Sequence, residues 1–352
     1  MKMQKIVLFV CLLWAMTVTT PVLLHRGGGE TERMETVSAD TRPETETAAV
    51  PDGPERSADA AVQVEVMVDG LKNAFSLDEY LPGVLAAEMP ASFPEEALQA
   101  QAVAARSFIL YRMAHPPADG VHDGTPLCSD PAHCKGWVRI TDDAAAYNLF
   151  GSGYRDAREK LRAAVAATDG MILTYVGETA LTAFHAISGG RTESAEDVWG
   201  EAVPYLVEVD SPGEESAQRF TQTLRFDSGE LRERLLAAWP DAQLPKDPAL
   251  WLTAVERTPA GMIKTALLGG VPVTGMELRR QLGLNSADFT LSVRDGQVEI
   301  TTRGYGHGVG MSQYGARAMA LEGADYRTIL AHYYPGCDLS DLRDASVLAN
   351  DG

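Results

Sequence analysis

Residues 76–113 constrain the fold of this chain more than any other stretch, because they predict two helical regions separated by a proline. Ser76 and Glu79 form the capping-box pattern that opens a helix. Pro82 suits the start of a second short helical stretch, and Pro90 ends that stretch because the residue before a proline disfavours helical geometry. The first half of the segment therefore predicts an interrupted helical region that stops at Pro90.

A longer helix is expected over residues 93–113. Ser92 and Glu95 repeat the capping-box pattern at its start. Small and apolar side chains recur at helical spacing: Ala97, Leu98, Ala102, Ala105, Phe108 and Ile109. So many alanines allow a neighbouring backbone to approach closely, and we expect Arg106 and Ser107 to be buried.

One acid, Glu88, stands among small and apolar neighbours just before Pro90. Burial of this kind raises the pKa of a carboxyl group, and a general acid that works near neutral pH needs that rise. We therefore interpret Glu88 as a catalytic acid and base. On composition alone, the alternative is a structural ion pair between Glu88 and Arg106.

The charge of the chain limits its partners. It carries 49 Asp and Glu residues against 30 Lys and Arg residues, for a net charge of −19 and a pI near 4.8. Nucleic acid is disfavoured because phosphate binding needs concentrated Lys and Arg, and extensive contact with anionic lipid is disfavoured for the same reason. A polysaccharide is not excluded, since local contacts can hold it.

The N-terminus predicts a membrane anchor followed by a stalk. Residues 6–24 run without a charge for about 20 positions, enough to cross a bilayer core of about 30 Å. A cleaved signal peptide is the competing interpretation. The predicted organisation is a cytoplasmic tail (1–5), a transmembrane signal-anchor (6–24), a disordered polar stalk (25–60), a catalytic domain of one or two lobes (61–343) and a flexible tail (344–352).

The remaining segments mix helices and strands. Alternating valines over 62–70 predict a strand that ends in an Asp-Gly turn, and 289–304 predict a hairpin around an Arg-Asp-Gly-Gln turn. Further helices are expected at 155–168, 229–238, 275–283 and 326–339, and strands at 171–177 and within 251–274. These elements do not alternate regularly. We expect an α+β fold with mixed helices and antiparallel strands, which form an extracytoplasmic catalytic body with a substrate groove after a single N-terminal transmembrane helix.

His185 and Ser188 precede the glycine pair Gly189-Gly190 at a predicted strand end. A functional site and simple turn chemistry explain this pattern equally well. A hydrolase triad is not indicated, because the G-x-S-x-G elbow is absent.

A second glycine-dense segment, residues 304–315, opens a helix. It lacks the Lys-Ser/Thr of a phosphate-binding loop. Its glycines would let the backbone approach a ligand, with His307, Ser312, Gln313 and Tyr314 as polar groups. The alternative is a tight turn packed on a core.

His122, Cys128, His133 and Cys134 bring two thiols and two imidazoles into 13 residues. This set satisfies tetrahedral zinc, and four protein ligands leave no open position for substrate, so we expect a structural zinc site. The rival is a disulfide between Cys128 and Cys134, which is plausible outside the membrane. The HExxH motif of zinc peptidases is absent.

Three long segments occur over residues 77–337: LDEYLPGVLAAEMPASFPEEALQAQAVAARSFILYR, FHAISGGRTESAEDVWGEAVPYLVEVDSP and GYGHGVGMSQYGARAMALEGADYRTILAHYYPGC. Together, and in this order along the chain, they resemble the motifs of the stage II sporulation protein D family of peptidoglycan lytic transglycosylases. The related amidase-enhancer proteins share the same domain.

The resemblance implies cleavage of the MurNAc–GlcNAc β-1,4 bond of peptide-stripped glycan strands, which leaves a 1,6-anhydro-MurNAc end. It places the family's catalytic acid at Glu88. Other motif positions, implied to bind substrate, match Arg106, Ser107, Tyr111, His185, Ser188, Gln313 and Tyr314. Most glycosidases need two carboxylates, whereas this chemistry needs one, and only Glu88 is a convincing candidate. Pro82 departs from the β-branched or polar residue expected in relatives.

The resemblance also implies partners and a location. The partners are the amidase stage II sporulation protein P and the scaffold stage II sporulation protein M, at the sporulation septum and the engulfing membrane of the mother cell. The alternative function is a non-catalytic glycan-binding module that stimulates a cell-wall amidase. A zinc peptidase is a third and weaker hypothesis.

Overall fold

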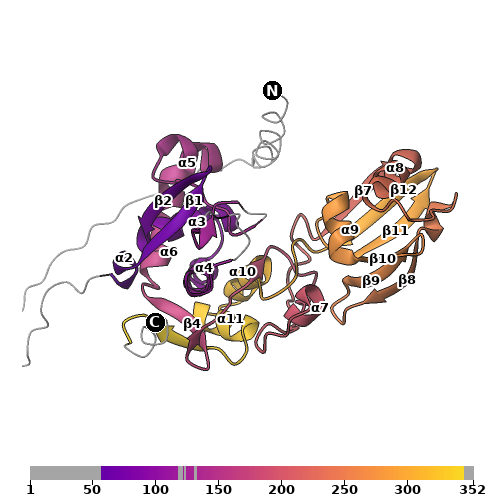
Figure 1. Ribbon diagram of the computed structural model, residues 1–352. Coiled ribbons are helices and arrows are strands. Elements are labelled where there is room, and N and C mark those ends of the chain that lie inside the picture. The colour runs from indigo at the N-terminus through magenta and orange to yellow at the C-terminus, as the bar shows by residue number, and fades with distance from the viewer. Residues whose placement is uncertain (1–56, 118–121, 123, 131–132, 345–352) are drawn as a thin grey trace, which may run out of the picture. The chain divides into compact units, whose positions relative to one another are not determined.

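The computed structural model describes residues 57–117, 122, 124–130 and 133–344 (Figure 1). They belong to one compact unit of the chain. Within these ranges no helix is both long and apolar enough to cross a membrane. The predicted anchor, most of the predicted stalk and the predicted tail beyond Asp344 lie outside the described residues.

The first described element is a short helix, α2 (Ala58–Ala61). It lies in the last residues of the predicted stalk, so the folded region begins before residue 61. The fold extends to these residues because Asp59 is buried and pairs with Arg106. Ser57 also caps the helix by accepting a hydrogen bond from the Ala60 N–H.

Helices α3 (Leu77–Glu88), α4 (Glu95–Ala114) and α6 (Tyr154–Ala166) pack against one another in the first hydrophobic core. Glu79 accepts a hydrogen bond from the Ser76 N–H at 3.3 Å, which confirms the predicted capping box. The predicted break near Pro82 is wrong, because α3 runs through it as one helix. A neighbouring segment supplies donors there: Trp137 Nε1 binds Tyr80 O at 3.2 Å.

The start of α4 differs from the prediction. Its N-cap is Pro94, without a side-chain hydrogen bond, so the predicted capping box of Ser92 and Glu95 does not form. The Phe93 N–H instead donates to Pro90 O at 3.0 Å, and this turn delays the helix to Glu95.

A three-stranded sheet of β1 (Gln63–Val68), β2 (Leu71–Ser76) and β3 (Leu127–Cys128) covers part of this core. Asp69 and Gly70 join β1 to β2 with φ of 50° and 77°, the geometry of a tight hairpin turn, as the Asp-Gly pattern predicts. Strand β3 pairs in parallel with β1 and so fixes the loop that carries the His and Cys residues.

The C-terminal part of the chain returns to the first core. Helices α10 (Gln313–Leu321) and α11 (Tyr326–Tyr333) contact α4 (Figure 1), and β14 (Asp338–Asp341) pairs with β4 (Met171–Tyr175), which also pairs with β5 (Glu178–Thr179). The predicted last helix is therefore too long. It stops before Pro335 and Gly336, whose φ of 85° turns the chain into β14.

Two three-stranded antiparallel sheets form a second hydrophobic core, in which Trp251 is buried. One contains β7 (Thr221–Asp227), β11 (Phe289–Arg294) and β12 (Gln297–Arg303), and the other contains β8 (Leu252–Arg257), β9 (Ile263–Leu268) and β10 (Val271–Thr274). Helices α8 (Ser228–Ala238) and α9 (Gly275–Leu282) and the 3-10 turn η3 (Pro248–Leu250) accompany them. The predicted hairpin at 289–304 is confirmed.

A two-residue parallel pair links distant segments. Strand β6 (Phe184–His185) pairs with β13 (Met311–Ser312), which places the His185 segment beside the start of α10. The remaining elements are α5 (Asp143–Phe150), η2 (Gly151–Gly153) and α7 (Ala195–Trp199). The fold is α+β with mainly antiparallel sheets, as predicted.

Candidate active site

Glu88 is the last residue of α3 and is half-buried. Val84, Leu85 and Met89 beside it are fully buried, so the acid stands at the edge of an apolar core. The Gln313 Nε2 amide donates a hydrogen bond to Glu88 Oε2 at 3.3 Å. Two residues predicted for the site, Glu88 and Gln313, are therefore in direct contact.

The pairing of β6 with β13 positions Gln313 at the start of α10. Ser312 caps this helix by accepting the Gly315 N–H at 3.2 Å, and the Tyr314 N–H donates to Ala186 O at 3.0 Å. The Gln313 amide also lies 3.4 Å from Gln101 Oε1 on α4. Contacts on both sides thus hold the amide toward Glu88.

Lys135 is a neighbour of Glu88 that the sequence did not indicate. Its Nζ lies 3.4 Å from the ring centroid of Phe184 and 4.8 Å from that of Phe108. Burial lowers the pKa of Lys135, while the nearby charges of Glu88 and Cys134 act in the opposite direction. A cation therefore lies within electrostatic range of the acid.

His185 and His307 lie together near this cation. Their ring centroids are 5.5 Å apart, and His307 is 5.6 Å from the half-exposed Trp199. Val309 connects the two rings, because its carbonyl lies 3.1 Å from His185 Nδ1 and its N–H donates to His307 Nδ1 at 3.1 Å. Burial lowers the pKa of His185 to about 4 and that of His307 well below its usual value, so both imidazoles are neutral near pH 7.

Ser188 does not face Glu88 but a second carboxylate, Glu214, which is fully buried. The Ser188 hydroxyl donates to Glu214 Oε2 at 2.8 Å. Further donors to the same carboxylate are the backbone N–H groups of Ser188, Gly189 and Gly190 and the hydroxyls of Ser211 and Ser312. Glu214 therefore joins three loops. Both of its carboxylate oxygens already accept hydrogen bonds, so it is not available as a catalytic acid or base.

Arg106 and Ser107 are fully buried in α4. Arg106 forms a bidentate ion pair with Asp59, at 2.7 and 2.6 Å, and donates to Met171 O at 2.9 Å. Ser107 Oγ accepts the Leu173 N–H at 2.8 Å. The alternative in which Arg106 pairs with Glu88 is therefore wrong. In this structure both residues connect α4 to its neighbours, and their predicted contact with substrate stays a prediction.

Tyr111 and Tyr314 are half-buried. Tyr111 stacks on His115 with centroids 4.4 Å apart, and Tyr314 meets Phe93 edge-on at 5.1 Å. Tyr314 directly follows Gln313, whereas no hydrogen bond among the described residues joins Tyr111 to Glu88 or Gln313. Tyr314 is thus the neighbour in sequence of the residue that binds Glu88.

The four predicted metal ligands are brought together. All of their donor atoms lie within 4.8 Å of one another. Cys134 Sγ is 3.4 Å from His122 Nε2 and 3.8 Å from His133 Nδ1, and Cys128 Sγ is 3.7 Å from His133 Nδ1. A tetrahedral zinc ion separates neighbouring sulfur and nitrogen ligands by about 3.5 Å. The cluster therefore has the size of a zinc site.

The disulfide alternative is not present, because Cys128 and Cys134 are both free thiols. Burial raises the pKa of the Cys128 thiol to about 11, and a bound cation would favour the thiolate by displacing the thiol proton to solvent. The donor set of two sulfurs and two imidazole nitrogens suits zinc better than calcium or magnesium, which prefer oxygen.

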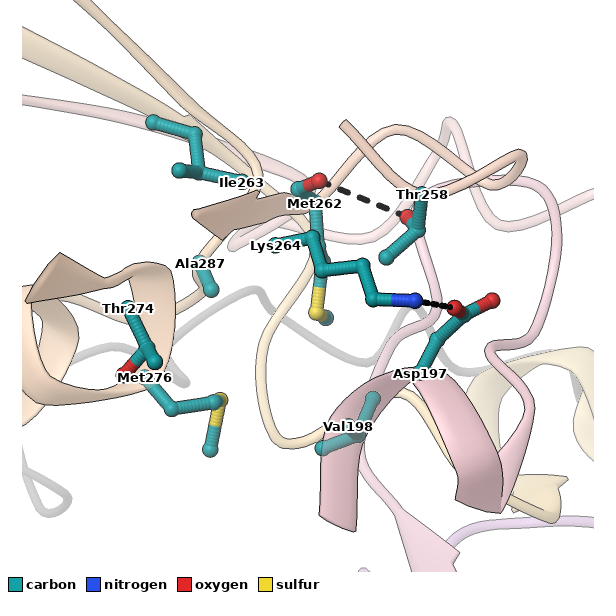
Figure 2. Close-up of a pocket in the computed structure, with 9 residues that line it drawn as sticks. All are labelled: Asp197, Val198, Thr258, Met262, Ile263, Lys264, Thr274, Met276 and Ala287. Carbon is teal, nitrogen blue, oxygen red and sulfur yellow. Dashed lines mark hydrogen bonds and ion pairs between the residues drawn. The ribbon is translucent and has the colours of Figure 1, made fainter. Parts of the chain in front are cut away.

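A small pocket elsewhere contains none of the residues predicted for the site (Figure 2). Its lining includes Asp197 and Lys264, whose charged groups are 2.6 Å apart and point toward each other in Figure 2. Thr258 and Met262 line the same pocket, and they also donate hydrogen bonds to the buried Glu193. The charged groups of this pocket are therefore paired within it.

Comparisons with known proteins agree with these motifs. A family described as stage II sporulation protein matches residues 70–175. Stage II sporulation protein D of Bacillus amyloliquefaciens is 38% identical over 276 residues, which cover 75% of this chain and 74% of that protein. Stage II sporulation protein D of Bacillus subtilis (strain 168) is 33% identical over 355 residues, which cover 96% of each chain. The chain belongs to the stage II sporulation protein D family, as its motifs predicted.

A more distant relative is an amidase enhancer of Bacillus subtilis (strain 168), 28% identical over 309 residues, 74% of this chain and 40% of that protein. Membership of the family, with this relative, supports a role in sporulation that is related to the cell wall.

Proposed function

We propose that this chain is a peptidoglycan lytic transglycosylase, which cleaves the MurNAc–GlcNAc β-1,4 bond of peptide-stripped strands and leaves a 1,6-anhydro-MurNAc end. The observation that carries the proposal is the half-buried Glu88, held by Gln313 without a second carboxylate partner. Among the described residues the fully buried carboxylates are Asp59, Glu193 and Glu214, and each accepts hydrogen bonds from groups other than Gln313.

The proposed reaction uses Glu88 twice. In its protonated form Glu88 gives a proton to the glycosidic oxygen, and the bond from that oxygen to C1 of MurNAc breaks. The resulting carboxylate accepts the proton of the 6-hydroxyl of the same sugar while O6 bonds to C1. This step closes the anhydro ring and returns Glu88 to its starting form. No water is consumed, so a second carboxylate is not needed to activate one.

The neighbours of Glu88 suit this chemistry. Gln313 orients the carboxyl group without adding a charge. His185 and His307 are neutral, so they offer polar contacts to a sugar without competing as strong acids. The exposed face of Trp199 beside His307 suits stacking against a pyranose ring, as flat aromatic faces do in binding sites.

The four-ligand cluster is proposed to hold structural zinc. Bound there by His122, Cys128, His133 and Cys134, the ion would supply no reaction step, because its coordination is complete. Its effect would be to fix the loop that ends at Lys135.

We also propose that residues 6–24 anchor the chain in the membrane with the catalytic domain outside, at the sporulation septum and the engulfing membrane. Stage II sporulation proteins P and M are the proposed partners. An amidase is chemically consistent with this substrate, since it removes the peptides from the strands before they are cleaved.

The test is a digest of purified, peptide-free glycan strands with the full chain and with Glu88→Gln. We expect the wild type to produce anhydro-MurNAc ends, detected by mass spectrometry. The variant should lose at least about 100-fold in rate, because Gln neither donates nor accepts the proton in this role. Glu95→Gln, at an exposed position in the first turn of α4, is the matched control and should keep full activity.

The second candidate is a non-catalytic module that binds glycan and stimulates an amidase, favoured by the similarity to an amidase enhancer. In that case the wild type releases no anhydro ends, and amidase activity rises equally with wild type and with Glu88→Gln. This pair of results would reject the transglycosylase.

A further inference from the structure

Lys135 lies in the same site as Glu88. Its Nζ contacts the face of Phe184 at 3.4 Å, and Phe184 pairs with Met311 in the β6–β13 ladder. Two residues after Met311, the Gln313 amide binds Glu88. One ring contact, one strand pairing and two residues of chain therefore separate the ammonium group from the donor that binds the acid.

The ammonium group of Lys135 has no hydrogen bond and no ion pair with any residue that the structure describes. Its contacts are the rings of Phe184 and Phe108, and its side chain is half-buried. The nearest acid that acts on it is Glu88, whose charge is felt by Lys135 although no ion pair joins the two. A partly desolvated cation between two rings binds an anion more strongly than an exposed lysine does.

The proposed substrate offers one anion. Each MurNAc carries a lactyl group on O3, and its carboxylate is free only after the stem peptide has been removed. While the peptide is attached, the same carbonyl is part of a neutral amide. The lactyl group belongs to the sugar whose C1 is cut, so it lies near the bond that Glu88 acts on.

We propose that Lys135 binds the free lactyl carboxylate of MurNAc and thereby restricts cleavage to peptide-stripped strands. This inference rests on the proposed function, because it names the group of the same substrate that the site recognises. A site built to pair with a charged group rejects an analogue in which that group is neutral or replaced.

The test varies the substrate charge and the side chain together. Peptide-free strands are compared with the same strands after their lactyl carboxylates have been converted to methylamides. The kcat/KM of the wild type should be about 10- to 100-fold higher on the carboxylate strands than on the methylamide strands. Lys135→Met should lose that preference by a selective fall on carboxylate strands, and Lys135→Arg should retain most of it. Lys246→Met, at an exposed position in the second core region, is the control and should behave as wild type.

The inference is overturned if the wild type cleaves both strands equally, or if Lys135→Met falls by the same factor on both. Measuring the affinity of both strands for Glu88→Gln and for Glu88→Gln with Lys135→Met separates this result from a failure of the proposed function. If the chain cuts nothing, a carboxylate preference in binding that Lys135→Met abolishes still supports the inference, and equal binding rejects it.

Discussion

His185 shows how a single buried side chain makes stability depend on pH. Its Nδ1 faces the Val309 carbonyl, and burial lowers its pKa from 6.5 to about 4. In the unfolded chain the imidazole takes up a proton below about pH 6.5, whereas in the folded chain it does so only near pH 4. The stability that the neutral His185 contributes is therefore fully present above pH 6.5, and it is lost as the pH falls toward 4.

We expect the free energy of unfolding to fall by about 2–3 kcal/mol between about pH 7.5 and about pH 4.5 through this residue alone. Urea denaturation of wild type and His185→Asn over that range measures it, because the Asn amide replaces the Nδ1 donor without titrating. The variant should show the smaller loss, and the exposed His115→Asn should follow the wild type. Parallel curves for wild type and His185→Asn would contradict the assignment.

At the scale of single residues, some site residues could be predicted from the sequence and others could not, for a physical reason. Glu88 and Gln313 stand in motifs whose residue types point to chemistry. Lys135 and Glu214 carry no such pattern, because their environment is made by partners far away in the chain, such as Phe184 and Ser312. Arg106 was expected to be buried, but its partner Asp59 was placed in the stalk, since a four-residue helix leaves almost no periodic signal.

Helix α3 carries Glu88, and its packing depends on one glycine. A Cβ atom at Gly83 would lie 2.3 Å from Trp137 Nε1 and 2.5 Å from Val138 O. Trp137 also donates to Tyr80 O and stacks on the Tyr80 ring, so it cannot move away without loss. The close approach therefore explains a glycine in the middle of a helix.

Gly83→Ala should destabilise the protein by about 1–3 kcal/mol, although alanine favours an isolated helix by about 1 kcal/mol. The urea midpoint measures the change. Gly153→Ala is the control, because a Cβ there meets nothing within 4 Å, and it should be neutral or slightly stabilising. A Gly83→Ala variant as stable as wild type would show that Trp137 yields easily.

Elements with strong local signals were predictable, and those made by tertiary contacts were not. The hairpins at Asp69-Gly70 and Asp295-Gly296 follow from turn residues that tolerate positive φ. The two-residue strands β6 and β13 have too few positions for any alternation, yet their pairing places Gln313. Pro82 was expected to break α3, but donors from Trp137 and Val138 bind carbonyls around it.

At the scale of the whole molecule, the His and Cys cluster gathers four side chains of one stretch, from His122 to Cys134. Its loop pairs with β1 through β3 and ends at Lys135 beside the acid. Metal binding to a folded site adds its free energy to folding, so the metal and the stability of the chain are coupled.

We expect the purified chain to contain about one zinc ion and Cys128→Ser to contain almost none. A chelator should lower the Tm of the wild type by several degrees, since a loss of about 1 kcal/mol shifts Tm by roughly 2 °C in a folded region of this size and the metal contributes several kcal/mol. Cys337→Ser is the control, because Cys337 lies outside the cluster, and it should keep its metal. Equal metal content in Cys128→Ser and wild type would exclude this ligand set.

The hydrogen bond between Gln313 and Glu88 joins residues 225 positions apart. A ribosome that has finished α3 and both sheets of the second core, which end at Arg303, has therefore still not made the group that orients the acid. The proposed active site is therefore completed last during synthesis, and any product that stops before α10 carries Glu88 without its donor. We expect such incomplete chains to lack the proposed cleavage activity, even where α3 has folded.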